Sequence, residues 1–176
     1  MDGHASKVLV CYMSGTGCTK GVAEKIAETL ERVGADVDIA PVTSKPNVAA
    51  YDAVVAGSGV RAGAWHPAAK KWAARNADAL KGRPLALFTV GIALAHGPEK
   101  RDEMLGYTDK LLAKTGLDPV DLGVFGGWYE PQRFSGIERR IMKMAKAPEG
   151  DFRDWNAIQD WATGVARKLN AATTAI

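Results

Sequence analysis

The stretch Met13-Ser14-Gly15-Thr16-Gly17-Cys18-Thr19 decides the fold, because it joins two segments of different hydrophobic pattern. The apolar run 7–12 before it predicts a strand, and apolar residues at helical spacing over 22–33 predict a helix after it. The free N–H groups and the dipole at a helix N-terminus favour an anion, and Ser and Thr hydroxyls can donate to phosphate oxygens. The pattern therefore predicts a phosphate-binding loop, and an ordinary glycine-rich turn is the alternative.

Two common phosphate-binding motifs are missing from this loop. A P-loop requires Gly-Lys-Ser or Gly-Lys-Thr, which does not occur in the chain. A dinucleotide fingerprint would place a glycine where Lys20 stands, but the next glycine after Gly17 is Gly21. Hydroxyls at alternate positions without a lysine favour a terminal monoester phosphate over a bridging pyrophosphate.

The composition is typical of a globular protein, with 47% hydrophobic and 24% charged residues in a chain of 176. This length predicts a single domain over 1–176. The net charge of +3 is too small to indicate nucleic-acid binding. Since 1–6 lack the apolar core of a secretion signal and no apolar run approaches a membrane span of about 18 residues, we expect a cytoplasmic protein. Cys11 and Cys18 have neither disulfide nor metal-ligand spacing, so we expect no metal.

Apolar patterns alternate between strand and helix along the rest of the chain. We expect strands at 35–40, 52–57, 84–90 and 120–126, and helices at 67–79, 99–115 and 155–169, with Asp154 as the cap of the last. This alternation predicts right-handed βαβ units, a parallel sheet and a three-layer α/β fold. Five strands with the phosphate loop after the first fit the order 2-1-3-4-5, in which a ligand lies beside strands one and three.

That order brings three loops to one edge of the sheet: 14–19, 58–66 and 91–98. Glycines in the two longer loops allow the backbone to approach a flat aromatic ligand closely. Trp65 is the candidate for stacking on such a ligand. Alternatively, Trp65 anchors the following helix against the sheet.

The pattern Ser14-x-Thr16-Gly17-x-Thr19 resembles the FMN phosphate loop of the flavodoxin family, and the resemblance runs from the first strand to the last helix. Within that family the chain is most similar to the menaquinone-dependent protoporphyrinogen dehydrogenases. The segments that carry this similarity are 58–66, 97–101, 137–144 and 154–155. Two features differ from that branch: Ala62 stands where an aromatic residue is common, and the segment between 144 and 155 is shorter.

The resemblance implies a flavodoxin-like fold that binds FMN without a covalent link. The residues it implies as FMN contacts are Ser14, Gly15, Thr16, Gly17, Cys18, Thr19, Ser58, Gly59, Val60, Arg61, Ala62, Gly63, Trp65, Val90, Gly91, Ile92, His96 and Gly97. The flavin supplies its own redox chemistry, and Arg61 and His96 are the candidates for catalytic contacts.

The resemblance also implies a function. It points to an FMN-dependent oxidoreductase of heme biosynthesis that moves electrons from an organic substrate, such as protoporphyrinogen IX, to a quinone. The alternative is a soluble flavodoxin-type electron carrier that serves protein redox partners.

The charges in the two loops expected beside the flavin ring bear on its reduction potential. Loops 58–66 and 91–98 contain no carboxylate, but they contain Arg61, His66 and His96. A cation near the ring favours the anionic reduced form, so we expect a higher potential than that of an acidic flavodoxin. The alternative for Arg61 is a solvated surface side chain.

An insert at 127–150 separates the fifth strand from the last helix, and it is longer than most such connections. Within it, 135–146 predicts an amphipathic helix. Five Lys or Arg and one Glu over 131–146 give this segment a formal charge of +4, which leaves −1 for the remainder. A basic amphipathic helix predicts peripheral contact through 134–146 with the inner face of a membrane. The alternatives are docking of a partner protein, packing on the edge of the sheet, and a methionine cover over the flavin.

Overall fold

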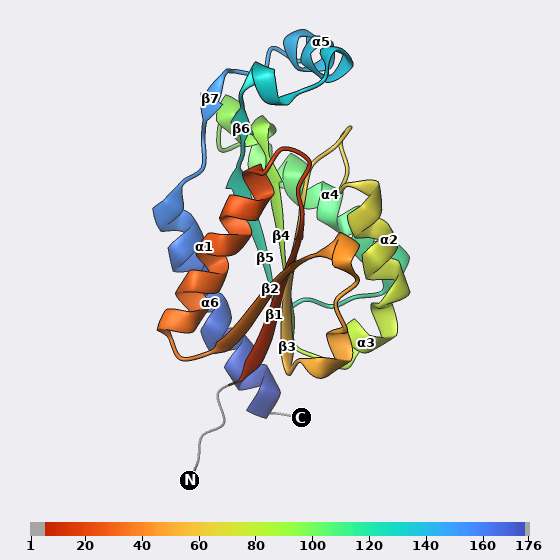
Figure 1. Ribbon diagram of the computed structural model, residues 1–176, viewed down its shortest axis with the longest axis vertical. Helices are drawn as coiled ribbons and strands as arrows, with labels where there is room; N and C mark the ends of the chain where they lie inside the picture. The colour runs from red at the N-terminus through yellow and green to blue at the C-terminus, as the bar shows by residue number, and fades with distance from the viewer. Residues whose placement is uncertain (1–5, 175–176) are drawn as a thin grey trace.

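The computed structural model describes residues 6–174. Its central sheet has five parallel strands in the order β2-β1-β3-β4-β5, which confirms the predicted topology. The strands are β1 (Lys7–Met13), β2 (Asp36–Pro41), β3 (Ala53–Gly59), β4 (Leu85–Gly91) and β5 (Asp121–Gly126). Figure 1 shows the sheet between two layers of helices, so the fold is the predicted three-layer α/β arrangement.

Six α-helices, four short 3₁₀ helices and a two-stranded ribbon complete the described part of the chain. The helices are α1 (Cys18–Arg32), α2 (Pro67–Arg75), α3 (Ala77–Lys81), α4 (Lys100–Thr115), α5 (Gly136–Met144) and α6 (Trp155–Thr174). The 3₁₀ helices are η1 (Val42–Ser44), η2 (Val48–Ala50), η3 (Ile92–His96) and η4 (Pro131–Arg133), and the ribbon pairs β6 (Trp128–Tyr129) with β7 (Gly150–Asp151).

Each face of the sheet has its own apolar core. In β1, Val8 and Val10 pack toward α1 and α6, whereas Leu9 and Cys11 pack toward α2, α3 and α4. Successive side chains of a strand point to opposite faces, so a strand covered on both sides must be apolar throughout. This double burial explains the nearly continuous apolar runs in the sequence.

The predicted helix over 67–79 is two helices that meet at Asn76. The Trp72 carbonyl oxygen accepts two hydrogen bonds from Asn76. One comes from the side-chain amide over 2.9 Å, and the other is the helical bond from the backbone N–H. Such local side-chain bonds compete with helix continuation. The predicted cap of α6 is confirmed, because the Asp154 carboxylate accepts the Ala157 N–H over 3.0 Å.

The insert forms an arm that carries α5 beyond the carboxyl ends of the strands (Figure 1). Ser135 caps α5 through a reciprocal pair of bonds: the Ser135 hydroxyl accepts the Glu138 N–H, and the Glu138 carboxylate accepts the Ser135 N–H. No residue of α5 is buried, so the alternative of packing on the sheet edge is wrong. Within residues 6–174, no helix is long and apolar enough to cross a bilayer.

Candidate functional site

A cavity of about 490 Å³ lies between the carboxyl ends of β1, β3 and β4 and the arm that carries α5. Its volume falls within the usual range for small-molecule sites. Twelve of the predicted contact residues line it: Ser14, Gly15, Thr16, Cys18, Thr19, Gly59, Val60, Arg61, Ala62, Val90, Gly91 and Ile92. The fold therefore brings all three predicted loops to one cavity.

The loop 14–19 has the backbone of an anion cradle. Gly17 adopts the left-handed conformation with φ of 91°, which places its N–H within 2.9 Å of the Ser14 hydroxyl oxygen. The first turn of α1 follows directly, with its N–H groups unpaired inside the helix. Gly15 is exposed, and a Cβ there would meet no atom within 4 Å, so the loop leaves open space in front of the helix.

The structure corrects the prediction that Trp65 stacks on the ligand. Arg61 and Ala64 exchange backbone hydrogen bonds around a tight turn, and this turn directs Trp65 back onto the sheet. Trp65 is 1% exposed, and its indole N–H donates to the Thr89 hydroxyl over 2.8 Å. Thr89 in turn contacts the Thr108 hydroxyl at 2.8 Å. The alternative interpretation, an anchor beneath the following helix, is the one that the structure supports.

Five other predicted contacts also lie outside the cavity lining: Gly17, Ser58, Gly63, His96 and Gly97. Ser58 is fully buried, and its hydroxyl is occupied by the Gly59 carbonyl oxygen and the His66 N–H. His96 is exposed at the end of η3. The histidine that lines the cavity is His66, which was predicted only as a nearby charge and not as a contact.

His66 caps the N-terminus of α2 and has a lowered pKa. Its Nδ1 accepts the Ala68 N–H over 3.2 Å and so caps the helix. Burial lowers the pKa of His66, and the charges of Arg61 and Lys70 lower it further. The lowered pKa favours the uncharged form of His66.

Arg61 is paired with a carboxylate that its own loop lacks. Glu138 reaches the cavity from α5, and its Oε1 lies 3.2 Å from Arg61 Nη2. Hydrogen bonds with Ser135 hold the pKa of Glu138 below its usual value, burial opposes this, and Arg61 adds to the lowering. The expectation of an uncompensated cation beside the ring is thus corrected, because the pair is neutral overall.

Both cysteine thiols have a raised pKa. Burial raises the pKa of Cys18 to about 11, although a hydrogen bond from the Trp128 N–H and the charge of Arg153 oppose this rise. Burial also raises the pKa of Cys11. Among residues 6–174, no cluster of His, Cys, Asp or Glu has the arrangement of a metal site.

Sequence reasoning missed most of the wall that the insert contributes. The cavity residues that it did not assign as contacts are Met13, His66, Ala93, Gly127, Trp128, Phe134, Ser135, Ile137, Glu138, Ile141 and Met142. Two signals in the sequence could have indicated these residues. The chain after the fifth strand leaves from the same sheet edge as the three loops, so the insert begins beside the cavity. Ile137 and Ile141 lie four positions apart and so share one helix face. Met142 lines the cavity, whereas Met144 is 83% exposed.

Comparisons with curated proteins find relatives that share one name. The chain is 26% identical over 179 residues to "Protoporphyrinogen IX dehydrogenase [quinone]" of Escherichia coli strain K12, covering 95% of this chain and 98% of that protein. A Leishmania major protein of the same name is 25% identical over 180 residues, covering 94% of this chain and 77% of the relative.

Solved structures with the same fold include flavodoxins. Flavodoxin 1 from Bacillus cereus aligns with a TM-score of 0.60 at 14% identity, over 92% of this chain and 98% of that one. A WrbA-like flavodoxin from Agrobacterium tumefaciens aligns with a TM-score of 0.57 at 19% identity, over 97% of this chain and 99% of that one. The family model for a flavodoxin domain matches residues 9–156. The chain therefore belongs to the flavodoxin domain family, and this family and fold imply a flavin cofactor.

Proposed function

We propose that this protein is an FMN-dependent oxidoreductase that oxidises protoporphyrinogen IX, or a closely related organic substrate, and passes the electrons to a quinone. The observation that carries the proposal is a single cavity with a phosphate cradle at one end and apolar walls beside it. The names of the relatives supply the substrate class and the acceptor.

The residues of the cavity fit FMN. The hydroxyls of Ser14, Thr16 and Thr19, with the first N–H groups of α1, suit the phosphate. The backbone segments 59–62 and 90–93 form the walls on either side of the space left for the ring. Bound there, FMN would supply the redox chemistry, and the protein would bind it, orient it and exclude water.

The roof of the cavity favours an enzyme over a simple carrier. Phe134, Ile137, Ile141 and Met142 line the side of the cavity that the insert provides. Together with Trp128 they form an apolar surface that a large flat organic molecule can occupy, and methionine adapts to irregular shapes. A carrier needs an exposed flavin edge and a docking face, but it has no use for an additional apolar wall beside the flavin.

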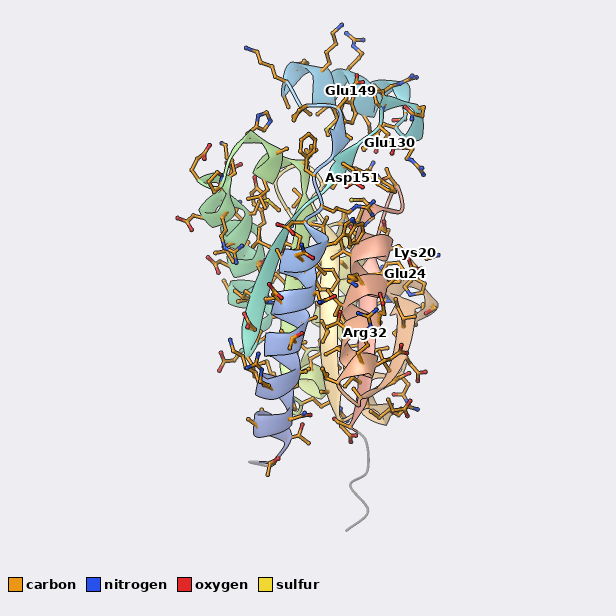
Figure 2. All side chains as sticks on the ribbon, turned by 90° about the vertical axis from the view of Figure 1, so that its left-hand side faces the viewer. Lys20, Glu24, Arg32, Glu130, Glu149 and Asp151 are labelled. Carbon is orange, nitrogen blue, oxygen red and sulfur yellow. The ribbon has the colours of Figure 1, made fainter. Side chains whose placement is uncertain are left out.

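The same arm supports peripheral membrane contact through 134–146. Met144, which does not line the cavity, is 83% exposed, and Arg139, Arg140 and Lys143 are exposed beside it. Side chains with nitrogen tips extend from α5 away from the sheet (Figure 2). Anionic lipids attract such basic clusters, while apolar side chains enter the lipid boundary. Because quinones reside in the bilayer, contact with its inner face would bring the cavity to its electron acceptor.

The test measures the appearance of porphyrin fluorescence under anaerobic conditions. FMN-loaded protein is mixed with protoporphyrinogen IX and either menaquinone in anionic vesicles or a water-soluble quinone. We expect quinone-dependent turnover with both acceptors. Binding of FMN without any turnover would contradict the enzyme and favour the carrier.

A charge variant of α5 tests the membrane contact separately. We expect the triple variant Arg139→Gln, Arg140→Gln and Lys143→Gln to lose vesicle binding and turnover with vesicle menaquinone, while turnover with the soluble quinone stays unchanged. The matched control removes three exposed cations far from α5: Lys81→Gln, Lys114→Gln and Arg167→Gln. Equal behaviour of the two triple variants would exclude the membrane contact.

A further inference from the structure

Trp128 joins the insert to the phosphate loop through two hydrogen bonds. Its indole N–H donates to the Thr16 hydroxyl oxygen over 3.1 Å, and its backbone N–H donates to Cys18 Sγ over 3.3 Å. A Cβ placed on Gly17 would lie 3.7 Å from the indole ring. Trp128 therefore lies directly against the segment that is proposed to hold the FMN phosphate.

The bond to Thr16 constrains where the Thr16 hydroxyl proton can point. A hydroxyl has one proton and two lone pairs, and the indole can only donate. Because the indole N–H binds one lone pair of the Thr16 oxygen, the Thr16 hydroxyl proton points away from the indole. Thr16 lines the cavity, so its hydroxyl proton is available to a ligand there. A phosphate in the cradle is the acceptor that this arrangement suits, since its oxygens carry negative charge.

We propose that Trp128 is a positioning residue that fixes the Thr16 hydroxyl as a donor to the FMN phosphate. This inference rests on the proposed function, because it requires FMN in the cavity. The insert would then not only line the cavity but also favour binding of the phosphorylated flavin over riboflavin.

The surroundings of Trp128 hold the indole in one orientation. The Arg153 guanidinium carbon lies 4.3 Å from the centroid of the indole ring, and that of Arg133 lies 4.7 Å from it. Asp151 binds Arg153 with two oxygens, at 2.8 Å from Nε and 2.5 Å from Nη2, and the Arg153 side chain is only 10% exposed. Figure 2 shows Asp151 on the strand that runs between α5 and the body of the protein.

Gly21 in the first turn of α1 makes room for this Arg153 side chain. A Cβ at this position would lie 2.6 Å from Arg153 Nη1, which is closer than a stable contact allows. The indole is thus fixed from the arm side by Arg153 and from the loop side by Thr16, while Cys18 holds the backbone N–H of Trp128.

The test compares FMN with riboflavin, which lacks the phosphate, in titrations of the apoprotein by flavin fluorescence quenching. Trp128→Phe keeps an aromatic ring but removes the indole N–H. We expect it to weaken FMN binding by about threefold to tenfold more than riboflavin binding, the size of one net hydrogen bond. The control is Trp155→Phe, because Trp155 also stacks on Arg153, at 4.4 Å, without touching the loop.

Two outcomes of this titration overturn the proposal. Equal weakening of both flavins would mean that Trp128 only shapes the cavity, and no change in either would mean that its bond to Thr16 has no effect on binding. A failure of the proposed function looks different, because then neither flavin binds the wild-type protein.

A double-mutant cycle identifies Thr16 as the partner. We expect Thr16→Val to weaken FMN binding at least as much as Trp128→Phe, Thr16→Ser to restore it, and Trp128→Phe to have no further effect in the Thr16→Val background. Additive effects would contradict the proposal.

A measurement on the wild-type protein avoids any dependence on the folding of variants. We expect the indole N–H resonance of Trp128 to shift when FMN binds and to shift much less with riboflavin. Equal shifts with both flavins would contradict the proposal.

Discussion

The substitution Trp65→Phe separates a core role of this tryptophan from a role in the flavin site. It removes the indole N–H that donates to Thr89 and leaves a small void beneath α2. The lost hydrogen bond costs about 1 kcal/mol, and a void of at least methyl size costs about 1 kcal/mol more. We therefore expect a loss of about 2 kcal/mol in the free energy of unfolding, equivalent to a fall in Tm of about 4–8 °C for a chain of this size.

The assay is urea denaturation of the apoprotein together with titration of flavin. Because Trp65 does not line the cavity, we expect Trp65→Phe to lower the urea midpoint with an unchanged m-value and to leave the FMN dissociation constant within about twofold of the wild type. The exposed Trp155 supplies the control, since Trp155→Phe should leave the midpoint in place. Unchanged stability with weakened FMN binding would refute the placement of Trp65 in the core.

Three further predictions concern the rim of the cavity. Burial, and to a lesser degree the charges of Arg61 and Lys70, lower the pKa of His66 in the folded protein below 6.5. The unfolded state therefore binds a proton at His66 more readily than the folded state does. As a result, the free energy of unfolding falls as the pH drops below 6.5. His66→Asn, which keeps a capping side chain, should remove that fall in urea titrations between about pH 5 and 7. Ala62 has a φ of 50°, in the left-handed region that strains a residue with a Cβ. Ala62→Gly relieves this strain in the folded state but adds conformational entropy to the unfolded chain, so we expect the free energy of unfolding to rise by about 0.5 kcal/mol. An unchanged or lower urea midpoint would contradict this. Glu138→Gln should raise the flavin potential by leaving Arg61 unpaired, and Arg61→Gln should lower it, as measured against a reference dye; shifts of the opposite sign would refute the charge argument.

The sheet order and the three cavity loops could be predicted because they depend on local patterns and general rules of α/β folds. The run 7–12 has the apolar content of a strand covered on both faces, and loop 14–19 has its glycines and hydroxyls where a strand passes into a helix. In a parallel sheet, the loops after neighbouring strands necessarily meet at the carboxyl edge. These facts place most of the cavity without any knowledge of side-chain contacts.

The remaining features depend on where distant segments fold in space. Nothing in the local sequence tells whether Trp65 points to the ligand or to the sheet, since the tight turn after Arg61 decides it. Glu138 and Trp128 reach the cavity only because the pairing of β6 with β7 carries the insert over the strand ends. The bond from Trp128 to Thr16 joins segments more than a hundred positions apart, and no periodic pattern encodes such a contact.

An anaerobic redox titration of the FMN-loaded protein, followed by absorbance, tests whether this cavity holds FMN as the redox centre of a quinone-linked enzyme. The Arg61–Glu138 pair is neutral overall and the lowered pKa of His66 favours its uncharged form, so the cavity lacks the excess of carboxylates that keeps acidic flavodoxins strongly reducing. We expect a single two-electron step at a potential above that of an acidic flavodoxin. Two well-separated one-electron steps at low potential would contradict it and identify an electron carrier.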